Sequence, residues 1–221
     1  MRRPSWTGSA NNLPTLNNLA ITRTGILFVI SAPSGAGKTT LISSLRQKGD
    51  FIYSVSCTTR LPRPGEVHGV DYFFMTDAEF HSHVALGDFL EHAEVHGRFY
   101  GTLKSNVLAH LEKGVDVLLD VDTAGAESIR SCEDPFIQAA LADVFIMPPG
   151  LEELSRRLRR RGTETEDQIS TRLRNAASEM QKWQDYRYTV ISGSMEEDIE
   201  KFRGIMRAER YLTRRLHLFF S

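Results

Sequence analysis

The residues with the clearest chemical potential lie in the stretch Ser31-Ala-Pro-Ser-Gly-Ala-Gly-Lys-Thr-Thr40. In such a stretch, the ammonium group of Lys38 can reach the β- and γ-phosphates of a nucleotide, and the hydroxyl of Thr39 can bind Mg²⁺. Gly35 and Gly37 allow the backbone angles of a tight turn and leave room for a phosphate beside the backbone. The stretch therefore predicts a phosphate-binding loop, which we call the P-loop.

The elements on either side of the P-loop support this interpretation. Residues 25–30 form a short apolar run with β-branched side chains, which predicts a buried strand, and Leu41, Ile42 and Leu45 are spaced like one face of a helix. Backbone N–H groups at the start of such a helix attract anions. The alternative is a plain strand–helix connection, because the strict motif has glycine where this chain has Ala32. The lysine and the two threonines favour the phosphate site.

Composition excludes several classes of function. The 221 residues suit one globular unit with inserted subdomains, and 41% hydrophobic with 25% charged residues is ordinary for a chain with a full core. The net charge of −1 gives no global basic surface for nucleic acid or membrane. No apolar run approaches the roughly 20 residues that span a bilayer. Cys57 and Cys132 are too few for a disulfide framework and lack metal-ligand spacing, so we expect reduced thiols and a cytoplasmic location.

Strands that alternate with helices around a P-loop predict an α/β fold with a parallel sheet flanked by helices. Residues 54–102 mix strand-forming residues with Pro and Gly turns, which predicts a small β-rich insertion. The apolar run 115–122 ends in Asp120 and Asp122, and functional groups gather at the C-terminal ends of parallel strands. Residues 1–24 are rich in Asn, Ser, Thr and Pro and lack the apolar core of a signal peptide. We expect them to be a disordered leader; a transit sequence is the alternative.

Two helices expected within residues 151–179 are rich in arginine. The first carries Arg156, Arg157, Arg159, Arg160 and Arg161. Gly162 breaks this helix, and Thr163 with Glu166 resembles a capping box for the second. Such a segment is either a solvated surface or an anion clamp, and a triphosphate site nearby favours the clamp.

A second group of phosphate donors lies in the insertion, where Arg60, Arg63, Tyr72 and Tyr100 could hold a second phosphate. Taken in order, five segments closely resemble the guanylate kinase family of nucleoside monophosphate kinases: SAPSGAGKTT, SCTTRLPRPGEVHGVDYFF, FLEHAEVHGRFYGT, LLDVDTAG and RRLRRRGTETEDQISTRL. Order and spacing agree from about residue 25 to about residue 207.

The resemblance implies a P-loop NTPase-type parallel sheet with a GMP-binding subdomain and a helical lid. It divides the guanylate kinase-like domain, residues 25–207, into a core (25–53, 103–150 and 180–207), a GMP-binding region (54–102) and a lid (151–179). Residues 208–221 are expected to be a C-terminal helix or tail.

The resemblance also implies the roles of individual residues. It places ATP on Ala32, Pro33, Ser34, Gly35, Ala36, Gly37, Lys38, Thr39 and Thr40. It places the phosphate of GMP on Arg60, Arg63, Tyr72 and Tyr100, and guanine on Ser56, Glu91, Thr102 and Asp122, with Asp120 in the same site. The catalytic residues that it implies are Lys38, Arg60, Arg157, Arg161 and Arg172. Thr39 would bind Mg²⁺, with Asp120 acting through water.

The implied activity is Mg²⁺-dependent in-line transfer of the γ-phosphoryl group of ATP to GMP, and to dGMP, in purine nucleotide salvage. The substrates are small molecules, no nucleic acid or membrane partner is expected, and the oligomeric state stays open. An acceptor phosphate with a second pKa of about 6 is already ionised at neutral pH, so no general base is needed. One rival is a catalytically inactive guanylate-kinase-like binding module, against which the intact P-loop argues. An RNA-binding protein is a weaker rival, because the net charge is close to zero.

The sequence departs from the family pattern at two single residues and in one short segment. Ala32 replaces the first glycine of the P-loop, and Ala124 stands where glutamine is common. The segment Ser192-Gly193-Ser194 replaces an Asn-Asp-Asp-like stretch, so the contacts to adenine are the least defined part of the resemblance.

Overall fold

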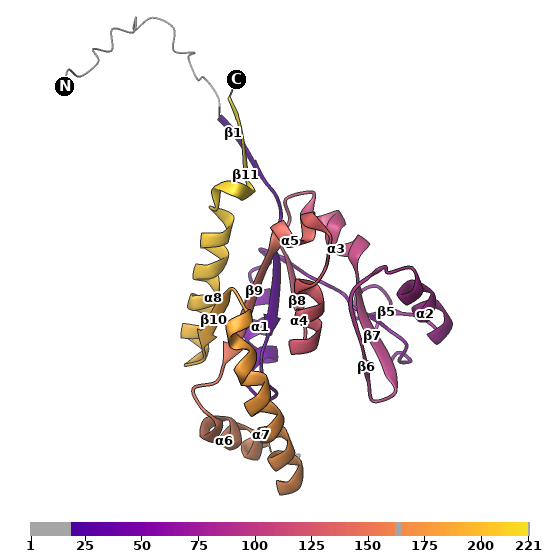
Figure 1. Ribbon diagram of the computed structural model, residues 1–221, viewed down its shortest axis with the longest axis vertical. Helices are drawn as coiled ribbons and strands as arrows, with labels where there is room; N and C mark the ends of the chain where they lie inside the picture. Colours follow the sequence, from indigo (N-terminus) through magenta and orange to yellow (C-terminus); the bar gives the residue numbers. More distant parts are fainter. Residues whose placement is uncertain (1–18, 162–164, 221) are drawn as a thin grey trace, which may run out of the picture.

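The computed structural model describes residues 19–161 and 165–220 and is built around a five-stranded parallel sheet (Figure 1). From edge to edge, the strands are β10 (Tyr188–Ile191), β9 (Leu141–Met147), β2 (Leu27–Ser31), β8 (Val117–Asp120) and β3 (Ile52–Tyr53). The P-loop follows the central strand β2, and Asp120 ends its neighbour β8. The sheet therefore brings the P-loop and the carboxylates to one edge, as the sequence predicts.

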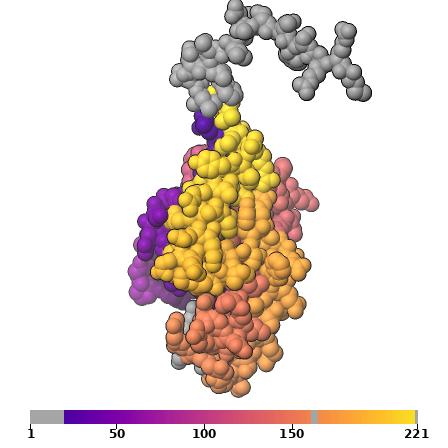
Figure 2. All heavy atoms as spheres, turned by 90° about the vertical axis from the view of Figure 1, so that its left-hand side faces the viewer, coloured from indigo at the N-terminus to yellow at the C-terminus, as the bar shows by residue number. Residues whose placement is uncertain are grey.

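Helices cover both faces of the sheet because β2 is apolar on both sides. Phe28 and Ile30 pack toward one layer and Leu27 and Val29 toward the other. The first layer consists of α1 (Lys38–Arg46) and α8 (Met195–Arg210), and the second of α3 (Lys104–Leu111), α4 (Thr123–Arg130) and α5 (Pro135–Ala140). Figure 2 shows α8 and the C-terminal residues covering one side of the molecule, above the lid helices. No helix of the described part is long and apolar enough to span a membrane.

The insertion forms a separate mixed sheet with its own small core. Its strands, in the order β5-β4-β7-β6, are β5 (Phe73–Phe74), β4 (Cys57–Thr58), β7 (Arg98–Leu103) and β6 (Phe89–Val95). Helix α2 (Asp77–Ala85) packs on this sheet through Phe80, which stacks on Phe89 and Phe99. The insertion lies to the right of the central sheet in Figure 1.

The arginine-rich segment folds as two packed helices, α6 (Leu151–Arg161) and α7 (Glu166–Gln181), followed by the short 3₁₀ helix η1 (Lys182–Asp185). Leu154 and Leu158 of α6 pack against Ile169 of α7. The predicted capping box is wrong: Thr165 caps α7 and pairs with Gln168, because the helix begins at Glu166. Thr163 lies outside the described residues.

The two ends of the chain form an antiparallel ribbon, which corrects two expectations. Strand β1 (Leu19–Arg23) pairs with β11 (Leu216–Phe220), so the end of the expected leader is ordered and the expected tail contains a strand after α8 and the 3₁₀ helix η2 (Thr213–Arg215). Composition failed to indicate this pairing because each strand is stabilised by a partner at the opposite end of the chain. Residues 1–18 lie outside the described residues.

Candidate active site

The P-loop has the backbone geometry that its glycines predict. Gly35 and Gly37 have φ angles of 89° and 97°, in the left-handed region that glycine adopts without strain. Helix α1 begins at Lys38, directly after the loop, so its first N–H groups face the loop's concavity. The side chain of Lys38 reaches across to the next strand, where Nζ lies 2.5 Å from Asp120 Oδ1 and donates to the Val121 carbonyl at 2.7 Å. The ammonium group thus stands between the P-loop and the end of β8.

A cavity of about 310 Å³ opens at the P-loop itself. Its walls are residues Ala32, Pro33, Ser34, Gly35, Ala36, Gly37, Lys38 and Thr39, together with Asp122 and Glu179. Eight of the nine residues that the resemblance assigns to ATP therefore line one hollow. The ninth, Thr40, lines a second cavity, which shares Gly35, Ala36 and Gly37 with the first.

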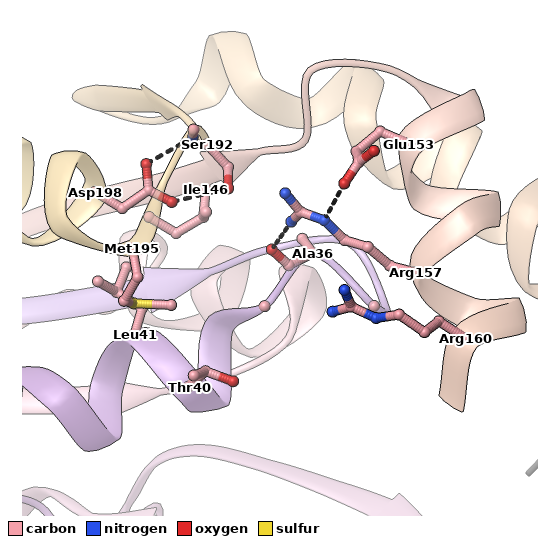
Figure 3. Close-up of a pocket in the computed structure, with 13 residues that line it drawn as sticks. Ala36, Thr40, Leu41, Ile146, Glu153, Arg157, Arg160, Ser192, Met195 and Asp198 are labelled. Atoms are coloured by element: carbon pink, nitrogen blue, oxygen red, sulfur yellow. Dashed lines mark hydrogen bonds and ion pairs between the residues drawn. The ribbon is translucent and has the colours of Figure 1, made fainter. Parts of the chain in front are cut away.

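That second cavity, of about 380 Å³, lies between the P-loop, the lid and the loop after β10 (Figure 3). Its apolar walls include Leu41, Ile146 and Met195. The loop with Ser192 and Gly193 is held by Asp198 of α8, whose carboxylate accepts hydrogen bonds from the Ser192 hydroxyl and the Gly193 N–H, both at 2.8 Å. A buried carboxylate thus shapes the segment in which this chain departs from the family pattern.

The lid touches the P-loop from both of its helices. Arg157 of α6 is held by Glu153 at 2.8 Å and donates to the Ala36 carbonyl at 3.0 Å. Arg172 of α7 donates to Ser34 Oγ at 3.3 Å. A Cβ atom at Gly35 would come within 2.9 Å of Leu158, so the glycine also allows the lid to pack on the loop. Arg161 ends α6, and its side chain is outside the described part of the chain.

A third cavity, of about 340 Å³, separates the central sheet from the inserted sheet. It contains six of the residues predicted for GMP: Ser56, Tyr72, Glu91, Tyr100, Asp120 and Asp122. Lys38 lines it as well. Arg60, Arg63 and Thr102 are not among its lining residues.

Thr102 lies behind the cavity wall and acts on Glu91. Its buried hydroxyl donates to Glu91 Oε1 at 2.7 Å. Burial raises the pKa of Glu91; the Thr102 hydrogen bond lowers it, and the charge of Asp122 raises it further. Asp122 is itself the N-cap of α4, because its Oδ1 accepts from the Gly125 N–H at 2.7 Å. Two acceptor side chains therefore stand side by side in the cavity, each fixed by one donor.

Arg60 is held at the margin of this cavity by Glu66. The guanidinium group makes a bidentate ion pair with Glu66, with hydrogen bonds of 3.0 and 2.8 Å. It also lies over the ring of Tyr72, where Arg60 Cζ is 5.3 Å from the ring centroid. Glu66 also accepts from the backbone N–H of Arg63 at 2.7 Å. Hydrogen bonding to Glu66 raises the pKa of Arg60, so this cation persists at every physiological pH.

The three cavities share walls and follow one another across the molecule. The cavity beside the lid and the P-loop cavity share Gly35, Ala36 and Gly37, and the P-loop cavity and the one at the inserted sheet share Lys38 and Asp122. All three cavities therefore meet at the P-loop, two through its glycines and the third through Lys38. This arrangement suits two ligands that approach each other through their phosphates.

The chain matches a family model described as guanylate kinase over residues 24–209. It belongs to the guanylate kinase family. It is 42% identical to the guanylate kinase of Clostridium perfringens over 91% of each chain, and 44% identical to that of Hahella chejuensis over 84% of this chain and 88% of the relative. The crystal structure of guanylate kinase from Anaplasma phagocytophilum superposes with a TM-score of 0.68 at 34% identity, covering 89% of this chain and 92% of that one.

Four side chains of this guanylate kinase family member were missed by sequence reasoning. Glu66 lies six residues after Arg60, a spacing that could have indicated an ion pair. Asp198 lies six residues after Ser192, at the start of α8. Arg160 lines the cavity beside the lid. The sequence could not single it out, because its neighbours in the sequence are also arginines. Glu179 gave no local signal, because its partner Ser34 is 145 residues away.

Proposed function

We propose that the chain transfers the γ-phosphoryl group of ATP to GMP and so forms ADP and GDP. The observation that carries the proposal is the pair of cavities that meet at the P-loop, with Lys38 lining both the loop cavity and the acceptor cavity. ATP would place its base beside Leu41, Ile146 and the Ser192 loop, with its phosphates on the P-loop. GMP would occupy the cavity at the inserted sheet.

Neutralising charge is the main catalytic task in this reaction, because two phosphate chains must approach in line. Lys38 would stabilise the transferring group from the P-loop side. Arg157 and Arg172 already contact P-loop residues and would close on the phosphates of ATP, with Arg161 at the end of the same helix. Arg60 and Arg63, with Tyr72 and Tyr100, would hold the phosphate of GMP. The acceptor oxygen is already ionised, so no general base is required.

The choice of guanine rests on Glu91 and Asp122. Guanine offers N1–H and N2–H₂ as donors, and an ionised carboxylate only accepts hydrogen bonds. Adenine would set a bare N1 lone pair against a buried negative charge, which a closed site disfavours strongly. Ser56 would contribute a hydroxyl at the same wall, and Thr102 would act through Glu91.

The oxygen atoms of Thr39 and Asp120 suit Mg²⁺, which prefers hard ligands and is usually held by one or two protein groups together with phosphate oxygens. In the described part of the chain, no group of three or more His, Cys, Asp or Glu side chains is arranged to hold a metal ion. Because phosphate oxygens usually supply part of the coordination of Mg²⁺, the ion would arrive with ATP. When bound, it would neutralise negative charge on the phosphates.

The parts of the molecule would divide the work as the family pattern implies. Residues 54–102 would bind GMP and residues 151–179 would act as the lid. We place the reaction in cytoplasmic purine nucleotide metabolism, which agrees with the free thiols of Cys57 and Cys132.

A direct test incubates the protein with Mg²⁺, ATP and one nucleoside monophosphate at a time, and measures ADP. We expect ADP with GMP, a slower reaction with dGMP, and background with AMP, CMP and UMP. Glu91→Gln replaces one acceptor oxygen with a donor amide, and should lower kcat/KM for GMP by ~10²-fold with little change in the KM for ATP. ADP formation at background with every monophosphate, GMP included, would contradict the proposal.

A further inference from the structure

Glu179 lies near the end of α7 with its carboxylate inside the P-loop cavity. Its Oε2 accepts a hydrogen bond from the backbone N–H of Ser34 at 3.2 Å. The same cavity is lined by Lys38 and Thr39. An internal carboxylate thus occupies one of the backbone donors at the loop that binds phosphate.

This contact sets the carboxylate in competition with the nucleotide. P-loop N–H groups attract anions because they point into one concavity at the positive end of a helix. A carboxylate accepts the same kind of hydrogen bond as a phosphate oxygen. Because both groups are negatively charged, the carboxylate also repels a phosphate at short range. We propose that Glu179 is an internal competitor for the P-loop, whose carboxylate must leave Ser34 before the phosphates of the nucleotide are fully seated. The inference rests on the proposed function and extends it to the control of phosphate binding.

The same helix face also carries a group with the opposite preference. Arg172 precedes Glu179 by seven residues, which is close to two helical turns, and donates to Ser34 Oγ at 3.3 Å. One P-loop residue therefore contacts an anion through its N–H and a cation through its hydroxyl, both from α7. A bound phosphate repels the first and attracts the second.

The consequence is a link between phosphate binding and the position of the lid. Ligands shift a conformational equilibrium only through different interactions with its two states. Displacement of Glu179 removes one attachment of α7 to the loop, while the phosphates add an attraction for Arg172. The bound state then favours a lid position in which the arginine, rather than the glutamate, faces the phosphates.

The test measures ADP binding by titration calorimetry, without GMP and with EDTA present to exclude metal. Glu179→Gln retains a side-chain oxygen that can accept from Ser34 but removes the charge. We expect it to bind ADP about five- to tenfold more tightly than the parent, in line with the loss of one like charge near the phosphates. Glu179→Asp retains the charge and should stay within about twofold of the parent.

The matched control is Glu166→Gln, the same substitution on the same helix. Glu166 pairs with Arg159 on the exposed side of the lid and is not among the residues that line the P-loop cavity. This variant should bind ADP as the parent does. A gain of equal size in the control would show a general effect of net charge and would overturn the proposal.

Equal or weaker ADP binding by Glu179→Gln would overturn it too, since the glutamate would then support the loop instead of competing for it. A thermal midpoint within about 2 °C of the parent shows that the variant is folded; if Glu179→Gln is destabilised, Glu179→Ala removes the same charge and must also tighten ADP binding. The comparison needs no GMP phosphorylation. Failure of the proposed reaction would therefore leave the test of Glu179 intact.

Discussion

At the scale of single residues, the site depends on carboxylates that are each fixed by a partner. Asp120 is paired with Lys38, Asp122 caps α4, and Glu91 accepts from Thr102. Burial raises the pKa of Glu91. The Glu91 carboxyl group therefore becomes neutral at a higher pH than an exposed glutamate does.

Thr102→Val should move the acid limb of the GMP reaction to higher pH. In the proposed function, the ionised form of Glu91 would accept from guanine, so activity should fall as the pH drops through its raised pKa. The Thr102 hydroxyl favours that ionised form, and its removal raises the pKa further. The measurement is kcat/KM for GMP between pH 5 and 8 in parent and variant. The ionisation of GMP itself is common to both, and superimposable profiles would contradict the assignment.

Lys38→Ala should lose turnover far more than stability. Losing a preorganised charge at the P-loop should lower kcat by ~10²-fold or more. The pair with Asp120 is partly exposed, so its removal should cost less than about 1 kcal/mol of unfolding free energy. Lys182→Ala, which removes a surface ion pair with Glu127, is the control and should leave kcat unchanged. Near-parental turnover in Lys38→Ala would refute its catalytic role.

At the scale of elements, the terminal ribbon is tied to the core by buried charges. Asp116 bonds Arg23 at 2.5 Å, Arg210 at 2.7 Å and the Ile26 N–H at 3.0 Å. Arg215, only 2% exposed, makes a close pair with Glu209 at the base of β11. Ile21 and Leu218, by contrast, are 59% and 46% exposed on one face of the ribbon. Its stability therefore comes from its base rather than from an apolar cover.

Deleting residues 1–24 should lower the thermal midpoint, because it removes β1 and the Arg23 partner of a fully buried carboxylate. We expect a loss of about 1–3 kcal/mol, which is several degrees in a chain of this size. Arg23→Ala should reproduce most of this loss. Deleting residues 1–18 keeps β1 and Arg23 in place, so we expect the midpoint and turnover of the parent. Equal midpoints for the two deletions, measured by calorimetry, would show that β1 contributes nothing.

Binding of a bisubstrate analogue should change hydrogen exchange in α6 and α7. Both helices contact the P-loop through Arg157 and Arg172, so ligand phosphates must alter those contacts. Helix α5, which packs on the central sheet in the same layer as α3 and α4, serves as the internal reference. Unchanged exchange in both lid helices would show that the segment is a fixed wall.

At the scale of the whole molecule, the three cavities at the P-loop lie among three parts: the central sheet, the inserted sheet and the lid helices (Figure 1). The cavity between the two sheets is lined in part by exposed residues such as Asp71 and Val95, so it is open to solvent there. Phosphoryl transfer to GMP rather than to water requires that this opening be closed during the reaction.

Binding of GMP together with a non-hydrolysable ATP analogue should bring the insertion and the lid closer together. Spin labels at the exposed positions Ser82 of α2 and Asn175 of α7 report this distance by double electron–electron resonance spectroscopy. We expect a shorter mean distance with both ligands than with either alone, because only the pair brings phosphates from both sides. A distance that is unchanged by both ligands would contradict closure.

The sequence determined the P-loop, the parallel α/β core and the family, because these depend on local patterns: glycines beside a strand, an apolar run that ends in aspartates, and motifs in fixed order. It also indicated which residues would gather around the phosphates. The tertiary structure alone placed Thr102 behind Glu91, paired Arg60 with Glu66, set Glu179 on Ser34 and joined β1 to β11. Two of these four contacts, Glu179 with Ser34 and β1 with β11, join residues distant in the chain. Thr102 and Glu91 are 11 residues apart on two paired strands, and Arg60 and Glu66 are 6 residues apart. Local propensity carries no signal for the two long-range contacts, which form only when the packed core fixes both partners in space.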